Sequence, residues 1–388
     1  MRSRSLRITF VSGNRVWGGS EELWSDAAAV LAREGHQLTV FKSRVAMQMD
    51  EPRLQTLAGL GVPIHDLARF PMMPDRLFAA LIVASNASTY AHEMARLRVG
   101  LAGTRPDLVV LSQGGNHDGF LLAEVCRRMS LPYVLLSQKA SDLYWPADSR
   151  RARVQQVYAA ARACYFVSEH NRRTTEEQLG FRLANAAVVR NPFLVSWKRR
   201  EDWPSMERGV RIACIGRLYP MEKGQDLLLR VLARERWRER PLHVTFYGTG
   251  LQSSGLEEMA RFLELRNVTF AGFVRDVDAI WSEHHALVLP SRCEGLPLVL
   301  VEAMLSGRVP IVTDVGGSGE VVTDDGTGFL AQGPSENSLD EAMERAWQRR
   351  EEWRAIGEAA ATHIRTLVPE DPAAVFASIV KEVAQATR

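Results

Sequence analysis

HALVLPSRCEGLPLVLVEAMLSGRVPIVTD, residues 285–314, contains two short apolar runs on either side of a helical pattern. Residues 285–291 and 309–314 have the length and the Val, Ile and Leu content of buried strands, whereas 298–306 have the pattern of a helix. A strand, a helix and a second strand in this order predict a parallel βαβ unit with its helix on one face of the sheet. The expected fold class is therefore α/β.

The same alternation continues through the rest of the chain and occurs in two series. The expected strands before residue 195 are residues 6–13, 37–43, 107–113, 131–138, 164–169 and 186–193, with a helix at 20–34 after the first of them. The expected strands after residue 195 are 211–218, 243–250, 267–274, 285–291 and 309–314, and the helices between or after them are about 224–234, 255–264, 276–282, 298–306 and 337–350. Two such series predict two doubly wound Rossmann-like domains, each with helices on both faces of a parallel sheet.

The domain boundaries follow from this repeat. A chain of 388 residues is long enough for two domains. We expect an N-terminal domain over residues 1–195 and a C-terminal domain over 196–369, with the polar stretch 196–208 as the linker between them. The tail at 370–388 is amphipathic, and we expect it to form a helix that joins the N-terminal domain.

The composition is that of an ordinary globular protein, with 46% hydrophobic and 24% charged residues. No apolar run reaches the length of a membrane-spanning helix, and the start, MRSRSLRITF, lacks the long apolar stretch of a signal peptide. The four cysteines lie far apart, without metal-ligand or disulfide spacing: Cys126, Cys164, Cys214 and Cys293. These features predict a cytoplasmic protein.

Charge is distributed unevenly along the chain. Residues 1–190 carry 24 Lys and Arg against 17 Asp and Glu, whereas the remainder carries 24 against 29. The basic half is compatible with an anionic acceptor or with the inner face of a membrane, and equally with scattered surface arginine. The segment 67–100, amphipathic after Pro74, fits either a helix pair packed in the core or a peripheral contact with a lipid-linked acceptor at a membrane.

In open α/β sheets, ligands bind where the strands end, so the residues that follow each strand are the candidates for chemistry. Gly18 and Gly19 follow the first strand and precede a helix, where the backbone amides can approach an anion closely. The pair is not a GxGxxG dinucleotide motif, and a simple turn is the alternative. Glu21 and Glu22 suit the positive end of the helix dipole but oppose a diphosphate unless they point away from it.

Two cations lie near the carboxyl end of the first strand of the second series. Gly216 and Arg217 lie at this end of the strand, and Lys223 comes just before the next helix. Permanent cations at this edge would neutralise a leaving diphosphate without a divalent metal. Ordinary surface cations on a solvated loop are the alternative.

Two carboxylates lie near the helix that follows HALVLPS. Glu294 lies in the loop between the strand and this helix, and Glu302 lies within the helix, in its apolar VLVEAML stretch. A carboxylate in such a helix is costly unless it is hydrogen-bonded, which indicates a ligand or an internal partner. The amides of the helix start can hold a phosphate, and the residues in that position are Gly295, Leu296, Pro297 and Leu298. Two unrelated carboxylates are the alternative.

With these motifs the chain resembles the family-4 retaining glycosyltransferases. The fold of that family is GT-B, with two Rossmann-like domains that face each other across a cleft. The resemblance is carried by GRLYPMEKGQDLLL, FYGTG, FAGFVRDV, the Glu-x7-Glu stretch EGLPLVLVEAM, DVGGSGEVV and DGTGFL, in the family's order over roughly residues 211–332. The N-terminal half matches more loosely, through WGGSE, VSEHNRR and RNPF.

The resemblance implies a function for each motif. The N-terminal domain would bind the acceptor and the C-terminal domain the nucleotide-sugar donor. The residues implied to carry the reaction are Arg217 and Lys223 on the donor diphosphate, Glu294 on the transferred sugar and His117 on the acceptor or sugar. The residues implied to bind the donor are Gly18, Gly19, Gly216, Phe273, Val274, Arg275, Gly295, Leu296, Pro297, Leu298 and Glu302, of which Glu302 would hold the ribose.

The resemblance also implies the reaction. A hexose would pass from a nucleotide diphosphate sugar to a glycan, a lipid-linked acceptor or a small molecule, with retention at the anomeric carbon. A UDP-sugar is the first expectation for the donor and GDP-mannose the second, and neither a cofactor nor a metal ion is expected. The departing phosphate itself would take the proton of the acceptor, so no separate base is required.

One motif departs from the family. Many relatives carry a histidine after the strand that corresponds to VLLSQ, where this chain has Gln138 and Lys139. His117, after the preceding strand, is the replacement that we expect, and an ordinary loop histidine is the alternative. Gln113, Gln138 and Lys139 also sit at strand ends and could contact the sugar instead.

A nucleotide-sugar 2-epimerase and a non-catalytic nucleotide-sugar-binding scaffold are the alternative functions. A nucleotide-sugar 2-epimerase needs acid and base carboxylates on the same scaffold, and a non-catalytic nucleotide-sugar-binding scaffold would have no use for a leaving-group clamp. A metal at Asp276 and Asp278, or at His284 and His285, is disfavoured because the aspartates open a helix and the histidines lack partners at ligand spacing. No dense basic-aromatic face indicates nucleic-acid binding.

Overall fold

The computed structural model describes residues 4–68, 89–198, 202–207 and 209–386. Contacts divide the chain into two compact units. Unit 1 comprises Met1–Pro192 and Asp371–Arg388, and unit 2 comprises Phe193–Glu370. The boundaries expected from the sequence were 195/196 and 369/370.

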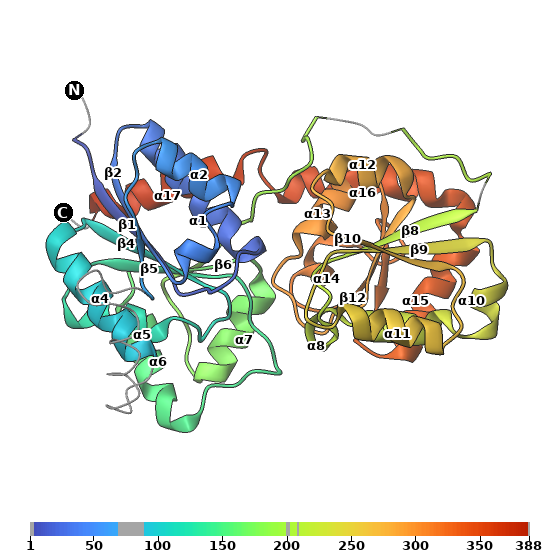
Figure 1. Ribbon diagram of the computed structural model, residues 1–388, viewed down its shortest axis with the longest axis horizontal. Coiled ribbons are helices and arrows are strands. Elements are labelled where there is room, and N and C mark those ends of the chain that lie inside the picture. The colour runs from blue at the N-terminus through green and yellow to red at the C-terminus, as the bar shows by residue number, and fades with distance from the viewer. Residues whose placement is uncertain (1–3, 69–88, 199–201, 208, 387–388) are drawn as a thin grey trace. The chain divides into compact units, whose positions relative to one another are not determined.

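Unit 1 contains a seven-stranded sheet of order β3-β2-β1-β4-β5-β6-β7, in which every pairing is parallel (Figure 1). Its strands are β1 (Arg7–Ser12), β2 (Gln37–Lys42), β3 (Ile64–Asp66), β4 (Leu108–Gln113), β5 (Tyr133–Ser137), β6 (Ala163–Phe166) and β7 (Ala186–Val188). The strand order reverses between β1 and β4, so the crevice at which ligands bind in such folds lies beside their carboxyl ends. The short edge strand β3 was not expected from the sequence.

The helices of unit 1 form two apolar layers, one on each face of the sheet. They are η1 (Gly19–Glu21), α1 (Glu22–Arg33), η2 (Val45–Met47), α2 (Pro52–Gly59), α4 (Thr89–Thr104), α5 (Phe120–Arg128), α6 (Asp148–Ala160), α7 (Glu169–Leu179) and α17 (Pro372–Ala386). The C-terminal helix α17 lies beside α1 (Figure 1), where Phe376 and Val380 are buried in the same cluster as Leu23. Lys381 Nζ on α17 also lies 2.9 Å from Glu34 Oε2. The last residues of the chain therefore complete the core that its first residues begin.

Unit 2 contains a six-stranded parallel sheet of order β10-β9-β8-β11-β12-β13 around a single large apolar core. Its strands are β8 (Val210–Ile215), β9 (Leu242–Tyr247), β10 (Val268–Gly272), β11 (Ala286–Leu289), β12 (Val309–Thr313) and β13 (Phe329–Ala331). Its helices are α8 (Pro220–Lys223), α9 (Gln225–Leu232), α10 (Glu235–Glu239), α11 (Ser253–Phe262), α12 (Val277–Glu283), α13 (Leu298–Leu305), α14 (Ser318–Val321), α15 (Glu336–Gln348), η3 (Arg350–Glu352) and α16 (Trp353–Leu367). Two parallel, doubly wound units confirm the expected fold class.

Several expected strands were too long at their carboxyl ends, because those residues turn into loops. The expected strand 243–250 ends at Tyr247, since Gly248 has a φ of 123° that does not fit a strand. The strand expected at 186–193 ends at Val188. These truncated ends form the loops from which candidate ligand-binding groups project.

Neither unit shows a membrane-spanning element in its described residues, since no helix there is both long and apolar enough to cross a bilayer. Most of the amphipathic segment expected at 67–100 lies outside the described residues. Its last part belongs to α4, where Leu97 and Leu101 are buried in the core of unit 1.

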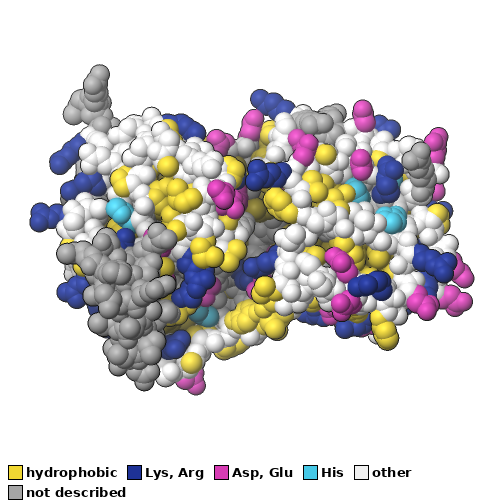
Figure 2. Space-filling view, viewed as in Figure 1, with side chains coloured by type: hydrophobic (Ala, Val, Ile, Leu, Met, Phe, Trp, Pro, Cys, Tyr) yellow, Lys and Arg dark blue, Asp and Glu magenta, His cyan; other side chains and the backbone are white. Residues whose placement is uncertain are grey.

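On the described part of the face in Figure 2, the Lys and Arg side chains of unit 1 are spread among neutral and apolar ones and form no continuous patch.

Candidate active site

The strongest group of candidate residues lies in unit 2, where the strand order reverses between β8 and β11. Lys223 ends α8, the short helix after β8, and Glu294 lies in the loop after β11. Lys223 Nζ donates to Glu294 Oε1 over 2.6 Å, and Ser291 Oγ donates to the same oxygen over 2.8 Å. The two residues predicted to act on the diphosphate and on the sugar therefore form one ion pair.

Backbone and side-chain contacts hold these two loops together. The amides of Arg292 and Cys293 both donate to the carbonyl of Glu222, at 2.7 and 3.1 Å. The Arg292 guanidinium donates to both carboxylate oxygens of Asp226, at 2.6 and 2.9 Å. Burial raises the pKa of Asp226, but hydrogen bonds from Arg292 and Arg230 outweigh it and keep the pKa below its ordinary value. The loop that carries Glu294 is thereby fixed to the helix that carries Lys223.

Arg217 has the exposure that a ligand-binding cation needs. Its side chain is 57% exposed, and its Nη2 lies 3.3 Å from Glu222 Oε2. The guanidinium carbon lies 5.5 Å from the centre of the Tyr219 ring. Because more than half of the side chain stays exposed, the planar guanidinium group can also donate two parallel hydrogen bonds to phosphate oxygens.

Two glycines allow the backbone to pack closely around Glu294 and Lys223. Gly224 has a φ of 65°, and a Cβ there would lie 1.8 Å from the carbonyl oxygen of Pro290. Gly316 has a φ of 61°, and a Cβ there would lie 2.4 Å from the carbonyl oxygen of Glu294. Only glycine fits either position, because a side chain would be both strained and in collision with the backbone.

Glu302 lies in α13 and is buried with 4% of its surface exposed. Its Oε1 accepts a hydrogen bond of 2.9 Å from the amide of Leu194. This carboxylate therefore has an internal partner, which explains how an apolar helix tolerates it. The same helix begins after Pro297, next to Gly295 and Leu296, and its first amides have no acceptor within the helix.

The loop after β10 contains the residues predicted to face the base. Phe273 is 69% exposed, Arg275 is exposed and Val274 is partly buried. Asp276 is engaged as the N-cap of α12, where its Oδ1 accepts from the amide of Ala279 over 3.0 Å. His284 follows that helix, and its Nδ1 lies 2.8 Å from the Ile280 carbonyl. In the described chain, no three His, Cys, Asp or Glu side chains gather closely enough to hold a metal ion.

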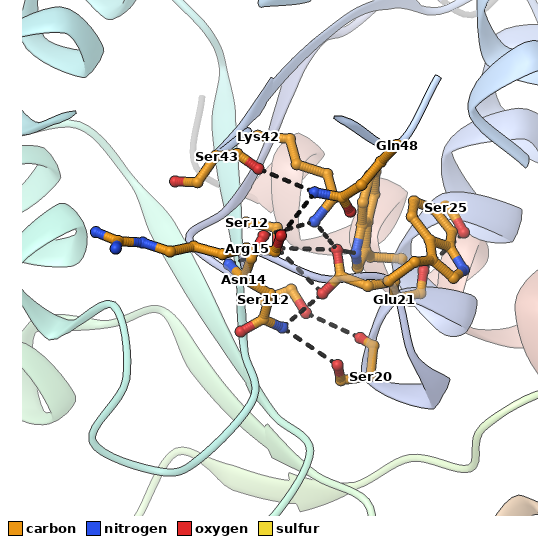
Figure 3. Close-up of polar contacts among 12 residues, drawn as sticks. Ser12, Asn14, Arg15, Ser20, Glu21, Ser25, Lys42, Ser43, Gln48 and Ser112 are labelled. Carbon is orange, nitrogen blue, oxygen red and sulfur yellow. Dashed lines mark hydrogen bonds and ion pairs between the residues drawn. The ribbon is translucent and has the colours of Figure 1, made fainter. Parts of the chain in front are cut away.

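In unit 1, the predicted glycine turn has a charged group directly behind it. Gly18 and Gly19 are exposed, and Gly18 is fully extended. Glu21, two residues later, is completely buried and lies 2.8 Å from Nζ of the equally buried Lys42 (Figure 3). Glu22 accepts from Trp17 Nε1 over 2.9 Å. Glu21 thus points into unit 1, and Lys42 neutralises its charge. The repulsion of an anion that the sequence suggested for Glu21 is therefore removed.

His117 is half-buried and belongs to a hydrogen-bond network. Its Nε2 lies 2.9 Å from Gln178 Oε1, which also accepts from Asn116 Nδ2 over 2.8 Å. An amide oxygen only accepts, so the ring hydrogen is on Nε2. Burial lowers the pKa of His117, and its buried Nδ1 has no hydrogen-bond partner among the described residues. Its contact with a sugar stays a prediction.

The neighbouring glutamines are also internal. Gln113 Oε1 accepts from Ser137 Oγ over 2.7 Å, and Gln138 Oε1 accepts from Asn191 Nδ2 over 2.7 Å. Both glutamines are buried, so in this structure they hold loops in place instead of facing solvent.

Sequence reasoning missed three residues that support the candidate site: Lys42, Gln178 and Ser291. Lys42 directly follows the apolar pair Val40 and Phe41 at the end of the strand QLTVFK, and a charged residue that is buried there needs a partner. Gln178 lies on α7 and has no signal in the sequence, because its hydrogen-bond partners are 34 to 62 residues away. Ser291 is the last residue of the expected strand 285–291 and lies two residues beyond the observed end of β11, so its position at the carboxyl edge could have been used.

Comparison with known proteins finds similarity to a family over part of the chain. Residues 209–349 match the model of the family described as glycosyl transferases group 1. The D-inositol 3-phosphate glycosyltransferase of Corynebacterium aurimucosum is 31% identical over 167 residues, which are 39% of this chain and 38% of that protein. A GDP-mannose-dependent α-(1-6)-phosphatidylinositol monomannoside mannosyltransferase of Mycolicibacterium smegmatis is 27% identical over 247 residues, which are 58% of this chain and 63% of that protein. The match thus spans less than two thirds of either relative.

Among solved structures, HepE of Anabaena in complex with UDP and glucose superposes with a TM-score of 0.74 at 17% identity. The superposition covers 98% of this chain and 99% of that one. An identity this low supports the fold alone. The chain therefore has the GT-B fold, and its residues 209–349 match the model of the glycosyl transferases group 1 family.

Proposed function

We propose that this protein is a retaining, metal-independent glycosyltransferase that moves a hexose from a nucleotide diphosphate sugar to an acceptor. Unit 2 binds the donor, and unit 1 binds the acceptor. The observation that carries the proposal is the Lys223–Glu294 ion pair at the carboxyl edge of β8 and β11, beside the exposed Arg217. A scaffold that only binds a nucleotide needs no such pairing of a cation with a carboxylate.

The chemistry follows from the charges at this edge. Arg217 and Lys223 stabilise the negative charge that develops on the diphosphate as the glycosidic bond breaks. Glu294 accepts hydrogen bonds from hydroxyl groups of the transferred sugar, and Glu302 accepts them from the ribose. The departing phosphate oxygen takes the proton of the acceptor hydroxyl, so the reaction needs neither a nucleophilic side chain nor a metal.

The descriptions of two related proteins support a ranking of the candidate donor nucleotides. HepE of Anabaena is described in complex with UDP and glucose, and the Mycolicibacterium smegmatis relative is described as GDP-mannose-dependent. We propose a UDP-hexose first and GDP-mannose second. The acceptor is a glycan, a lipid-linked or otherwise anionic acceptor or a small molecule, and the enzyme acts in the cytoplasm or at the inner face of the membrane.

A thermal-shift screen with UDP-, GDP-, ADP- and dTDP-sugars, with EDTA present, tests the donor site. A ligand that binds the native state raises the melting temperature by mass action. We expect one nucleotide class to shift the wild type, Arg217→Ala and Glu302→Ala to lose the shift, and the control Arg354→Ala to keep it. Arg354 is 70% exposed on α16 and pairs with Glu358 in its own helix. No shift with any sugar nucleotide would overturn the proposal.

Product stereochemistry tests the reaction itself. Proton NMR of the product, once an acceptor is found, should show the anomeric configuration of the donor. An inverted product would contradict the retaining mechanism. A sugar nucleotide that changes configuration at C2 without any acceptor would instead identify an epimerase.

A further inference from the structure

Arg292, in the loop after β11, binds the chain on both sides of Lys223, the last residue of the short helix α8. Its Nη1 donates to the Pro220 carbonyl over 2.7 Å and to Asp226 Oδ1 over 2.6 Å. Its Nη2 donates to Asp226 Oδ2 over 2.9 Å. Pro220 begins α8, and Asp226 lies in the first turn of α9. One guanidinium group therefore holds the segment that carries Lys223 before and after that residue.

The helix α8 cannot fix the direction of Lys223 by itself. It has four residues, fewer than a helix needs to be stable alone, and its N-cap residue Tyr219 does not cap it with a side chain. Gly224, in the left-handed conformation, ends the helix directly after Lys223. The direction of the Lys223 side chain therefore depends on contacts that hold α8 from outside.

The acidic partner of Lys223 lies two residues after Arg292 in the same loop. Glu294 Oε1 accepts from Lys223 Nζ over 2.6 Å and from Ser291 Oγ over 2.8 Å. Ser291 is buried, and its carbonyl accepts from Thr313 Oγ1 over 2.6 Å, so the loop has a fixed base on β12. Arg292 thus connects the loop that presents one member of the ion pair to the helix that presents the other.

The two segments would stay joined without the Arg292 side chain. The amide of Arg292 donates to the Glu222 carbonyl over 2.7 Å, whatever side chain the residue carries. Gly224 packs so closely that a Cβ there would lie 1.8 Å from the carbonyl oxygen of Pro290. These backbone contacts hold the segments together, so the guanidinium group is left to set the alignment of the ion pair.

The Arg292–Asp226 pair is better suited to fix geometry than to add stability. Both side chains reach solvent, with exposed fractions of 25% and 15%. Ion pairs that water reaches contribute little to stability. Two parallel hydrogen bonds from a planar guanidinium group to one carboxylate, in contrast, fix the angle between the two groups. A lysine at position 292 would keep the charge and lose this geometry.

We propose that Arg292 and Asp226 are positioning residues for glycosyl transfer: their bidentate pair aligns Lys223 with Glu294, so that the lysine acts on the diphosphate while the glutamate holds the sugar. The inference rests on the proposed function and adds two residues that act only through this ion pair. All the contacts that carry it lie within unit 2.

A double-mutant cycle with Glu294→Gln separates alignment from a general loss of structure. Arg292→Lys keeps the charge without the bidentate geometry, and Asp226→Asn keeps the size of the side chain without its charge. The rate is the release of nucleoside diphosphate from the sugar nucleotide that the thermal-shift screen selects, with UDP-glucose tried first. The affinity is the Kd of the matching nucleoside diphosphate.

We expect Arg292→Lys and Asp226→Asn each to lower kcat by about tenfold, because a small displacement of a reacting group is costly in the transition state. The Kd of the nucleoside diphosphate should stay within about twofold. In the Glu294→Gln background, the same two substitutions should lower kcat by less than about twofold more, since the ion pair that they align is already lost. A general structural defect would instead multiply the two losses.

Arg345→Lys is the matched control. Arg345 on α15 also has a side chain that is 25% exposed, and it likewise joins a carboxylate to a backbone carbonyl. Its Nη1 donates to Asp324 Oδ1 over 3.0 Å, and its Nη2 donates to the Leu330 carbonyl over 2.8 Å. This variant should change the melting temperature about as much as Arg292→Lys does, and it should leave kcat unchanged.

If Arg292→Lys does not fold, Asp226→Asn and its combination with Glu294→Gln decide the matter. A wild-type kcat in either folded single variant would overturn the inference and leave the proposed function intact. So would a tenfold loss that recurs in full in the Glu294→Gln background, or an equal loss in Arg345→Lys. A wild-type chain that neither binds nor cleaves any sugar nucleotide would overturn both.

Discussion

Lys223 Nζ lies 2.6 Å from Glu294 Oε1, and the two residues are 71 positions apart in the sequence. The contact joins α8, which follows β8, to the loop after β11. The strands β8 and β11 are neighbours in the sheet of unit 2. In this ion pair the cation lowers the electrostatic cost of a buried carboxylate, and the carboxylate orients the ammonium. The pair is therefore the centre of the proposed donor site.

Replacement of either member should affect turnover more than nucleotide binding. We expect Lys223→Met and Glu294→Gln each to lower kcat by about 100-fold or more, because the lost groups act on charge that develops in the transition state. The Kd for UDP, measured by calorimetry, should change by less than about tenfold, since Arg217 and Glu302 remain. Either variant with a kcat near that of the wild type would contradict the proposed function of the pair.

Two variants of Glu302 should separate its contribution to stability from its contribution to nucleotide binding. Its Oε1 accepts from the amide of Leu194, and an amide oxygen in Glu302→Gln can keep that hydrogen bond. Glu302→Ala cannot, and the unpaired amide should cost about 1–3 kcal/mol of unfolding free energy in urea titrations. Both variants should bind UDP about tenfold more weakly, because the ribose loses a charged acceptor. A Gln variant with unchanged affinity would remove Glu302 from the ribose site.

Gly224 should tolerate no side chain. In Gly224→Ala the new Cβ would meet the Pro290 carbonyl, in a left-handed backbone conformation, so we expect a loss of more than about 2 kcal/mol and a displaced Lys223. Gly255→Ala is the control, since Gly255 lies in α11 with open space around it. There the substitution should stabilise the protein by up to about 1 kcal/mol. Thermal melts compare the two, and equal effects would refute the argument.

The stability of unit 2 should depend on pH through its buried histidines. The amide of Arg211 donates to His285 Nδ1 over 2.9 Å, and His285 Nε2 lies 3.2 Å from the Pro204 carbonyl, so the ring is neutral. Burial lowers the pKa of His285 below its ordinary value of 6.5, and His284 is lowered for the same reason. Because the folded pKa is the lower one, the stabilisation is complete above pH 6.5 and is lost as the pH falls below it.

Thermal melts between about pH 8 and about pH 5 measure this dependence, and each unit of pKa difference contributes about 1.4 kcal/mol. His285→Gln should be less stable than the wild type at the upper end, and the difference should narrow toward the lower end. A difference that stays constant over the whole range would show that His285 does not titrate between the two states.

Much of the candidate site in unit 2 was predictable, because its residues occupy the positions that follow strands. Arg217, Lys223 and Glu294 each lie within a few residues of an apolar run, and parallel strands bring their carboxyl ends to one edge. Their mutual pairing was not predictable. The sequence indicated two cations on a diphosphate, whereas the structure pairs Lys223 with Glu294 and sets Arg217 beside Glu222.

The sequence by itself determined the α/β class, the two sheets and the motifs of the glycosyl transferases group 1 family, because apolar periodicity and turn residues are local properties of the chain. Only the tertiary structure decided that Lys42 forms an ion pair with Glu21, that Gln178 hydrogen-bonds to His117 and that the amide of Leu194 donates to Glu302. Each of these contacts joins segments far apart in the sequence, and burial is what makes it necessary: a polar group removed from water must find whichever partner the fold brings near.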